Sequence, residues 1–181
     1  MSFLGKNFDI KNDDRFNVLN SRKILKKDVS IIGYDQPINS GSQATIAGVR
    51  TQLLNDGQGT GSYSTAVLWN PINNRINLQD AQIGDFIDIN IILASVSTGG
   101  IFQFPLELDY SPLLDGSQVV TNPITRLALV TAGNMVALDY EIKFVITQEM
   151  KENGIGVMVT PFASYTLVNT YFSIVRLKIP T

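Results

Sequence analysis

Two aspartates and an asparagine stand within the most apolar run of the sequence, IGDFIDINIILAS at residues 83–95. Paired carboxylates could act as a general acid and base, or they could bind a metal ion. Side chains alternate between the two faces of a strand, so Asp85 and Asp88, three residues apart, are expected on opposite faces. The two could meet only if Asp85 belonged to the turn at Gly84. This spacing therefore argues against an acid–base pair.

The apolar residues of the same segment support a strand. They share one face without interruption: Ile87, Ile89, Ile91 and Leu93. Phe86, Asp88, Asn90 and Ile92 share the other face, as in an amphipathic strand. We therefore predict that Asp88 and Asn90 lie at a surface or an interface.

A second acidic pair, Glu107 and Asp109, is spaced two residues apart and would share one face of a strand. Asp88 could lie opposite this pair on a neighbouring strand, and three carboxylates could bind Ca²⁺. The sequence has no aspartate-rich loop with the spacing of an EF-hand. We therefore expect solvated carboxylates on a strand face, and neither a metal ion nor another cofactor.

The composition excludes several catalytic classes. The chain has no cysteine and no histidine, so disulfides, thiolate zinc sites and Ser-His-Asp or Cys-His catalysis are ruled out. The glycine-rich stretch NDGQGTGS at residues 55–62 lacks the Gly-Lys-Ser/Thr ending of a phosphate-binding loop. Trp69 fits a core or interface aromatic better than a sugar-stacking platform. We predict a protein that is not an enzyme; a polysaccharide-cleaving enzyme that uses Asp88, Glu107 and Asp109 is the least supported alternative.

The charges divide the chain into an N-terminal segment and a larger remainder. Residues 1–28 hold 7 of the 14 basic residues and 4 of the 16 acidic ones, a net charge of +3, whereas residues 29–181 carry a net charge of −5. The first segment is too sparse in apolar residues for a core, and we predict an extended arm that orders against a partner. The candidate partner-binding residues are Phe3, Leu4, Phe8, Ile10, Phe16, Arg22, Lys23, Lys26 and Lys27. A charge of +3 is weak for nucleic acid, which favours a protein partner.

From residue 29 onward, short apolar runs alternate with turn residues. The runs cover residues 29–34, 44–54, 63–70, 75–78, 85–95, 101–110, 124–132, 135–148, 155–163 and 165–179. β-Branched and aromatic residues fill them, and no stretch sustains a period of 3.6 residues; residues 147–154 could form one helical turn at most. This pattern predicts an all-β antiparallel sandwich or barrel.

Two of the runs show a clear alternation of buried and wet positions. In IFQFPLELDY, residues 101–110, one face consists of Phe102, Phe104, Leu106, Leu108 and Tyr110. In YEIKFVIT, residues 140–147, the corresponding face consists of Tyr140, Ile142, Phe144 and Ile146. Pro105 cannot donate a backbone hydrogen bond, so we expect the first of these strands at a sheet edge or at a bulge.

The hydropathy of the chain points to self-association. No apolar run approaches the roughly 20 residues of a membrane helix, and the first ten residues lack the apolar core of a signal peptide. The mean hydropathy is nevertheless +0.11, more apolar than one modest sandwich easily hides. We therefore expect apolar subunit contacts in a cyclic homo-oligomer that does not associate with a membrane.

Two segments carry a resemblance to a known group of proteins. QIGDFIDINIILAS resembles the Gly-Asp turn and long strand of jelly-roll proteins of virus particles, which include trimeric modules similar to tumour necrosis factor and C1q on tailed-phage heads and fibres. YTLVNTYFSIVRLKI resembles their long C-terminal strand. The resemblance implies an antiparallel jelly-roll β-sandwich over residues 29–181, preceded by the arm of residues 1–28.

The same resemblance implies a function in the virion. We expect a homotrimeric decoration protein of a phage head, fastened by its arm to the major capsid protein or to another virion protein. One alternative is a receptor- or glycan-binding module of a fibre, which would use the glycine-rich loop, Trp69 and nearby tyrosines. A second alternative is a jelly-roll capsid protein that forms a shell.

Overall fold

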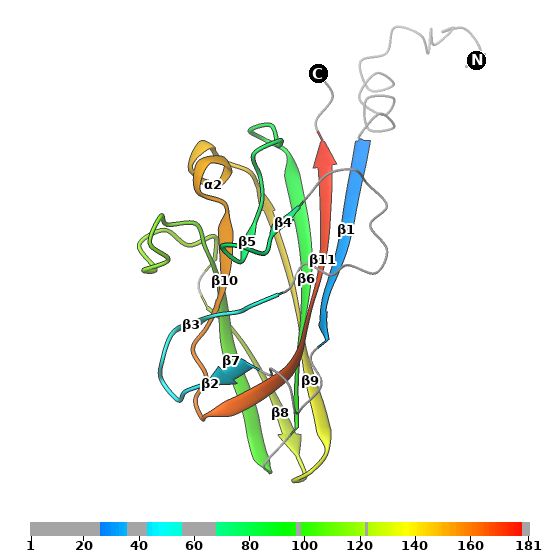
Figure 1. Ribbon diagram of the computed structural model, residues 1–181, viewed down its shortest axis with the longest axis vertical. Coiled ribbons are helices and arrows are strands. Elements are labelled where there is room, and N and C mark those ends of the chain that lie inside the picture. The colour runs from blue at the N-terminus through cyan, green and yellow to red at the C-terminus, as the bar shows by residue number, and fades with distance from the viewer. Residues whose placement is uncertain (1–25, 36–42, 56–67, 97–98, 122, 179–181) are drawn as a thin grey trace, which may run out of the picture.

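The computed structural model consists almost entirely of antiparallel strands arranged in two facing sheets (Figure 1). It describes residues 26–35, 43–55, 68–96, 99–121 and 123–178. Sheet I has the order β1-β11-β6-β9, with β2 also paired to β11; sheet II has the order β4-β5-β10-β7-β8, with β3 also paired to β10.

The strands of sheet I are long, whereas several strands of sheet II are short. Sheet I contains β1 (Lys26–Asp35), β2 (Gln43–Thr45), β6 (Phe86–Val96), β9 (Met135–Val145) and β11 (Tyr165–Lys178). Sheet II contains β3 (Thr51–Gln52), β4 (Trp69–Asn70), β5 (Arg75–Ile76), β7 (Gly100–Asp109), β8 (Ile124–Val130) and β10 (Ile155–Val159).

The pairing of the strands is nested. β7 pairs with β8 in sheet II, and the strands before and after them in the sequence, β6 and β9, pair with each other in sheet I. These four strands therefore form a folded-over double ribbon. The chain then returns to add β10 beside β7 and β11 beside β6, and β1 completes sheet I beside β11. This is the topology of an antiparallel jelly-roll β-sandwich, and the predicted fold class is confirmed.

The core lies between the two sheets and follows the predicted alternation. The inward side of β6 is fully buried, as is that of β7: Ile87, Ile89, Ile91 and Leu93 face Phe102, Phe104, Leu106 and Leu108 across the sandwich. The Tyr140 hydroxyl of β9 donates a hydrogen bond of 2.6 Å to the carbonyl oxygen of Phe104, which joins the two sheets. Burial raises the pKa of this phenol well above its usual range, so it remains a donor at any ordinary pH.

The segment predicted as one strand over residues 44–54 forms β2 and β3 instead. A turn separates them, and Gly48 adopts a left-handed conformation with φ of 69° there. The Gly48 amide donates to the carbonyl oxygen of Pro161 at 2.8 Å, which fixes the turn against the segment that follows β10. One apolar run therefore serves both sheets, because β2 pairs with β11 and β3 with β10.

Pro105 does not place β7 at a sheet edge, and that expectation is wrong. β7 is flanked by β8 and by β10. The register of β7 with β10 ends at Leu106 opposite Val159, and one further bond runs from the Thr160 amide to the Pro105 carbonyl oxygen at 3.0 Å. The missing donor of Pro105 therefore falls where the β7–β10 ladder ends.

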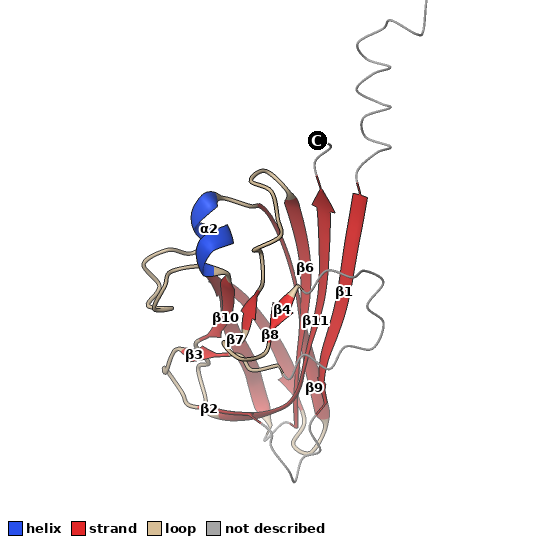
Figure 2. Ribbon diagram, turned by 45° about the horizontal axis from the view of Figure 1, so that its top comes forward, coloured by secondary structure: helices blue, strands red, loops and turns tan. Residues whose placement is uncertain are grey.

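The helix in the described part of the chain is α2 (Gln148–Asn153), at one end of the sandwich (Figure 2). It is six residues long, somewhat more than the single turn predicted. The Thr147 hydroxyl caps it by accepting from the Met150 amide at 3.4 Å, and Gly154 ends it. No helix among the described residues has the length and apolar character needed to span a membrane.

The structure bears only indirectly on the predicted arm. β1 begins at Lys26, three residues before the expected strand start at Val29, and it runs antiparallel to the end of β11. Residues 1–25 lie outside the described residues, and so does most of the glycine-rich stretch at residues 55–62. The arm therefore remains a prediction.

Candidate functional site

The aspartates of the predicted strand lie on opposite sides of sheet I. Asp85 is fully buried in the turn before β6, where its Oδ2 accepts from the Gln82 amide at 3.0 Å. Asp88 lies on the outer side of β6, and its Oδ2 is 3.7 Å from the Lys143 Nζ of β9. The predicted separation of the two carboxylates is confirmed, and Asp85 has a structural role in the turn.

Asp88 does not join Glu107 and Asp109 in one cluster. Asp88 belongs to sheet I, whereas the other two carboxylates extend from β7 in sheet II. The guanidinium of Arg50 lies between Glu107 and Asp109: its Nε donates to Glu107 Oε1, and its Nη2 donates to Asp109 Oδ2 at 2.6 Å. The three carboxylates considered as possible Ca²⁺ ligands therefore do not meet, and an arginine supplies the positive charge beside Glu107 and Asp109.

Asp109 is fully buried, so the expectation of a solvated carboxylate is wrong at this residue. Its Oδ1 accepts from the amide and the hydroxyl of Ser111, each at 2.7 Å, and its Oδ2 accepts from the Gly116 amide at 2.8 Å. Burial alone would raise the pKa of Asp109, but hydrogen bonds from Ser111, Arg50 and Gly116 together lower it. The carboxylate therefore holds the loop after β7 in place. The Asp-x-Ser spacing, typical of an Asx turn, is a sequence signal for this role.

A second arginine ties the same loop to the rest of the domain. The side chain of Arg75 donates to the carbonyl oxygens of Ser111 at 3.1 Å, Pro112 at 2.8 Å and Asn153 at 2.9 Å. The last of these bonds reaches the end of α2. The buried Arg75 and Asp109 and the half-buried Arg50 thus hold this loop in place, in contrast to an acidic site open to a substrate.

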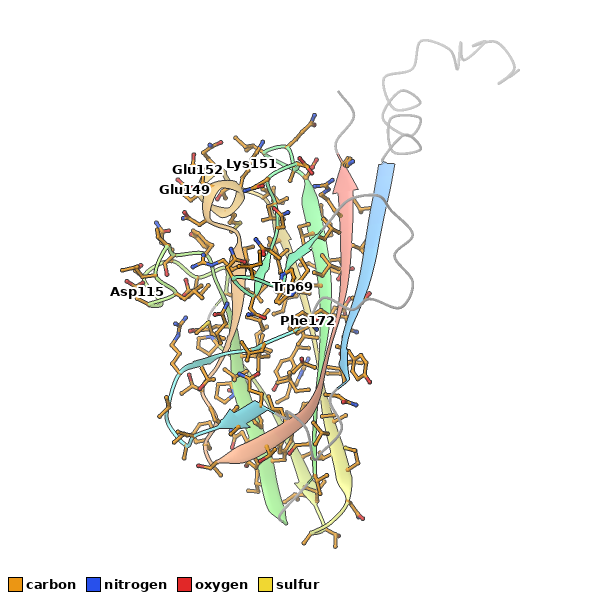
Figure 3. The ribbon with its side chains drawn as sticks, viewed as in Figure 1. Trp69, Asp115, Glu149, Lys151, Glu152 and Phe172 are labelled. Carbon is orange, nitrogen blue, oxygen red and sulfur yellow. The ribbon has the colours of Figure 1, made fainter. Side chains whose placement is uncertain are left out.

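Trp69 belongs to the core, as predicted. It is 3% exposed and packs edge-on against Phe172 of β11, with ring centroids 4.9 Å apart (Figure 3). Its indole Nε1 donates to the Asn55 carbonyl oxygen at 3.3 Å. A ring in this position cannot stack on a sugar in solution.

The outer face of sheet I, defined here by the outward residues of β11, β6 and β9, combines an apolar row at one end with a polar centre. The register aligns Leu177, Phe86 and Val145 at one end, and Asn169, Ala94 and Ala137 toward the other. Between them lie three rows: Val175, Asp88 and Lys143; Ser173, Asn90 and Glu141; and Tyr171, Ile92 and Asp139. Lys143 contacts both Asp88 and Glu141, whereas Asp139 forms no ion pair with a described residue.

Large apolar side chains are exposed on this face and along the adjoining edge. On β9, Val145 is 53% exposed and Met135 is 58% exposed. On β8, the edge strand of sheet II, Leu127 and Leu129 are exposed, and Leu129 stands opposite an exposed Ile101 of β7. Sheet face and strand edge thus both present apolar area to solvent, which is the usual mark of an interaction surface.

The predicted partner-binding residues are not brought together by the described structure. Phe3, Leu4, Phe8, Ile10, Phe16, Arg22 and Lys23 lie outside the described residues. Lys26 and Lys27 are the first two residues of β1, opposite Lys178 and Leu177 of β11. Their role in binding a partner remains a prediction.

No family model and no curated protein matches the chain in sequence. Among solved structures, the chain is similar to the globular domain of zebrafish complement 1qA, with 8% identity, 81% of this chain and 94% of that chain covered, and a TM-score of 0.49. It is similar to vertex protein P5 of PRD1, with 12% identity and a TM-score of 0.48; the match covers 84% of this chain and 73% of that chain. It is also similar to the tumour necrosis factor Eiger of S. frugiperda, with 6% identity and a TM-score of 0.49; the match covers 84% of this chain and 94% of that chain. Because these identities and TM-scores are low, the jelly-roll assignment rests on the strand topology and not on the similar structures.

Proposed function

We propose that the chain is a non-enzymatic structural protein of a virus particle: a homotrimer that decorates the head and is fastened by residues 1–28 to the major capsid protein or another virion protein. The segregation of basic and apolar residues into that N-terminal segment supports a fastening role. The Arg50 bridge between Glu107 and Asp109 supports a structural role over catalysis. The observation that carries the proposal is the apolar outer face of sheet I.

An antiparallel sheet with one side in the core normally presents polar residues on its other side. The outer face of sheet I departs from this pattern, because the row of Leu177, Phe86 and Val145 is apolar, and Val145 and Met135 are more than half exposed. Lys143 pairs with Asp88 and Glu141 within the face, which lowers the cost of covering these three charges with a second subunit.

A ring of three subunits needs two different surfaces, because each subunit meets its two neighbours through unlike patches. The chain offers both. The outer face of sheet I is one patch, and the edge at β8, with exposed Leu127 and Leu129, is the other. A face that meets an edge closes a ring without requiring the same patch on both sides of the contact.

Val145→Asp tests the self-association. The substitution introduces a charge into the apolar row formed with Phe86 and Leu177, and the exposure of Val145 means that the fold should tolerate it. Sedimentation equilibrium at micromolar concentration is expected to give a trimer for the wild-type chain of 19.9 kDa and a folded monomer for the variant. Ile72→Asp, at a position 93% exposed in the β4–β5 turn, is the control and should remain trimeric. A wild-type monomer under these conditions would contradict the proposal.

A truncation tests the role of the N-terminal segment. Removal of residues 1–25 leaves β1 complete, so the β-sandwich should remain folded by circular dichroism. Binding to capsids assembled without this protein is expected to disappear, as measured by co-sedimentation. Capsid binding that survives the truncation would show that the arm does not fasten the protein.

A further inference from the structure

A groove of about 480 Å³ lies on the outer side of sheet II. Pro105 and Glu107 of β7 and Thr125 of β8 line it, together with Gly48 and residues 160–162. Two backbone hydrogen bonds already described, from Gly48 to Pro161 and from Thr160 to Pro105, hold these segments together. The groove is therefore built on strand ladders, and its volume is that of a small-molecule site, roughly 300–1,000 Å³.

An exposed aromatic ring stands at this groove. Phe162 lies three residues after the end of β10 and is 66% exposed. Pro105, Pro123 and Pro161 also line the groove and extend its apolar surface. A ring exposed beside such a surface is ready to stack on the apolar face of a ligand.

Polar groups with unused hydrogen-bonding capacity share the groove with this ring. Glu107 is 14% exposed in its side chain, and Arg50 engages only its Oε1, so that Oε2 has no partner in the described part of the chain. The hydroxyls of Thr125 and Thr160 likewise make no hydrogen bond to a described residue. An acceptor and two hydroxyls thus accompany an apolar surface.

We propose that this groove binds a neutral saccharide, with the C–H face of one sugar ring on Phe162 and sugar hydroxyls at Glu107 Oε2 and Thr125. The cluster of Arg50, Glu107 and Asp109 carries one net negative charge, so an anionic ligand is disfavoured. A wholly apolar ligand would bury Glu107 Oε2 without a donor. A sugar ring satisfies both requirements, because it has an apolar face and a rim of hydroxyl donors.

The saccharide proposal rests on the groove alone, and not on the trimer or on the proposed place in the virion. The groove adjoins the assigned trimer contact, because Thr125 shares one side of β8 with Leu127 and Leu129. A trimer would present three such grooves, and multivalent binding would raise a weak single-site affinity by orders of magnitude.

Saturation-transfer NMR on the full chain tests the site directly, with the methyl glycosides of glucose, galactose, mannose and N-acetylglucosamine as probes. Binding of at least one glycoside is expected, and Phe162→Ala should weaken it about tenfold, the size of one lost aromatic contact. Phe162→Tyr should retain binding, whereas Thr125→Val, which keeps the side-chain shape without the hydroxyl, should reduce it. Leu113→Ala is the control, because Leu113 is 83% exposed on a loop outside the groove.

Cyclohexanol distinguishes a sugar site from an apolar one, since it has a ring of similar size with a single hydroxyl. We expect it to bind far more weakly than the best glycoside. The proposal is overturned if cyclohexanol binds equally well, if none of the four glycosides binds, or if Phe162→Ala leaves glycoside binding unchanged. None of these outcomes depends on whether the protein is a trimer.

Discussion

At the scale of single residues, the most consequential group is the buried Asp109. It receives hydrogen bonds from Ser111, Gly116 and Arg50, and so the loop after β7 is anchored by one carboxylate. Because the pKa of Asp109 is lowered in the folded protein, its charged form stabilises the fold at every pH above its ordinary pKa of 3.8. That stabilisation is lost as the pH falls through the lower pKa of the folded state.

Asp109→Asn should lower the free energy of unfolding at about pH 7 by about 3 kcal/mol, because an amide cannot accept from all of these donors and leaves Arg50 partly unpaired. The gap in unfolding free energy between variant and wild type should narrow as the pH falls below 3.8 and through the lowered pKa of folded Asp109, where the wild-type carboxyl is protonated as well. Urea unfolding at about pH 7 and along an acidic pH series measures both effects. Asp115→Asn, on the exposed part of the same loop, should change stability much less; equal effects of the two substitutions would contradict the anchoring role.

At the scale of secondary-structure elements, the junction of α2 with β10 depends on Gly154. This residue has φ of 68° and ψ of 179°, a conformation that is essentially restricted to glycine. A Cβ atom there would also lie 2.8 Å from the carbonyl oxygen of Ile76, which belongs to β5. Backbone conformation and close packing therefore both require glycine.

Gly154→Ala should cost about 3 kcal/mol or more, since backbone strain and a clash with main-chain atoms add together. Gly133→Ala is the matched control, because Gly133 has φ of 84° and nothing within 4 Å of an added Cβ. The control should cost about 1 kcal/mol, from the left-handed conformation alone. Thermal or urea unfolding of both variants measures the difference, and equal losses would mean that the contact with Ile76 relaxes at no cost.

At the scale of the whole molecule, the sandwich has two outer sides with different proposed roles. The outer face of sheet I and the β8 edge are assigned to self-association, and the groove on sheet II to a ligand. Because the core between the sheets is closed by β6, β7, β9 and β11, the exposed apolar area lies on surfaces that can meet another molecule. Stability should therefore depend on association as well as on the fold.

The melting temperature should rise with protein concentration, because subunit binding stabilises only the folded state. For a trimer of this chain length, a tenfold increase in concentration should raise Tm by about 2–3 °C. Differential scanning calorimetry over a hundredfold concentration range measures the effect. Val145→Asp should remove the dependence, and a wild-type Tm that is independent of concentration would contradict the trimer.

Much of the fold could be predicted, because strand alternation is a local pattern. The buried faces of β6, β7 and β9 follow the period of two residues in the sequence, and the opposite placement of Asp85 and Asp88 follows from the same parity. The break of residues 44–54 into β2 and β3 could not be predicted with the same ease, because Gly48 interrupts the run without changing its composition. The prediction that Pro105 places β7 at a sheet edge failed for a related reason. The point where the β7–β10 ladder ends depends on how the two strands pair, which the sequence near Pro105 does not show.

The sequence by itself determined that the chain is a β-sandwich without histidine or cysteine chemistry, because composition and alternation are properties of neighbouring residues. Only the tertiary structure decided which charges meet. Arg50 lies 57 residues before Glu107 and 59 before Asp109, yet it contacts both, whereas Asp88 is separated from them by the core. Contacts between residues so far apart depend on strand order and sheet packing, which leave no local pattern in the sequence. The groove at Phe162 has the same origin, since β7, β8 and the segments beside β10 form it together.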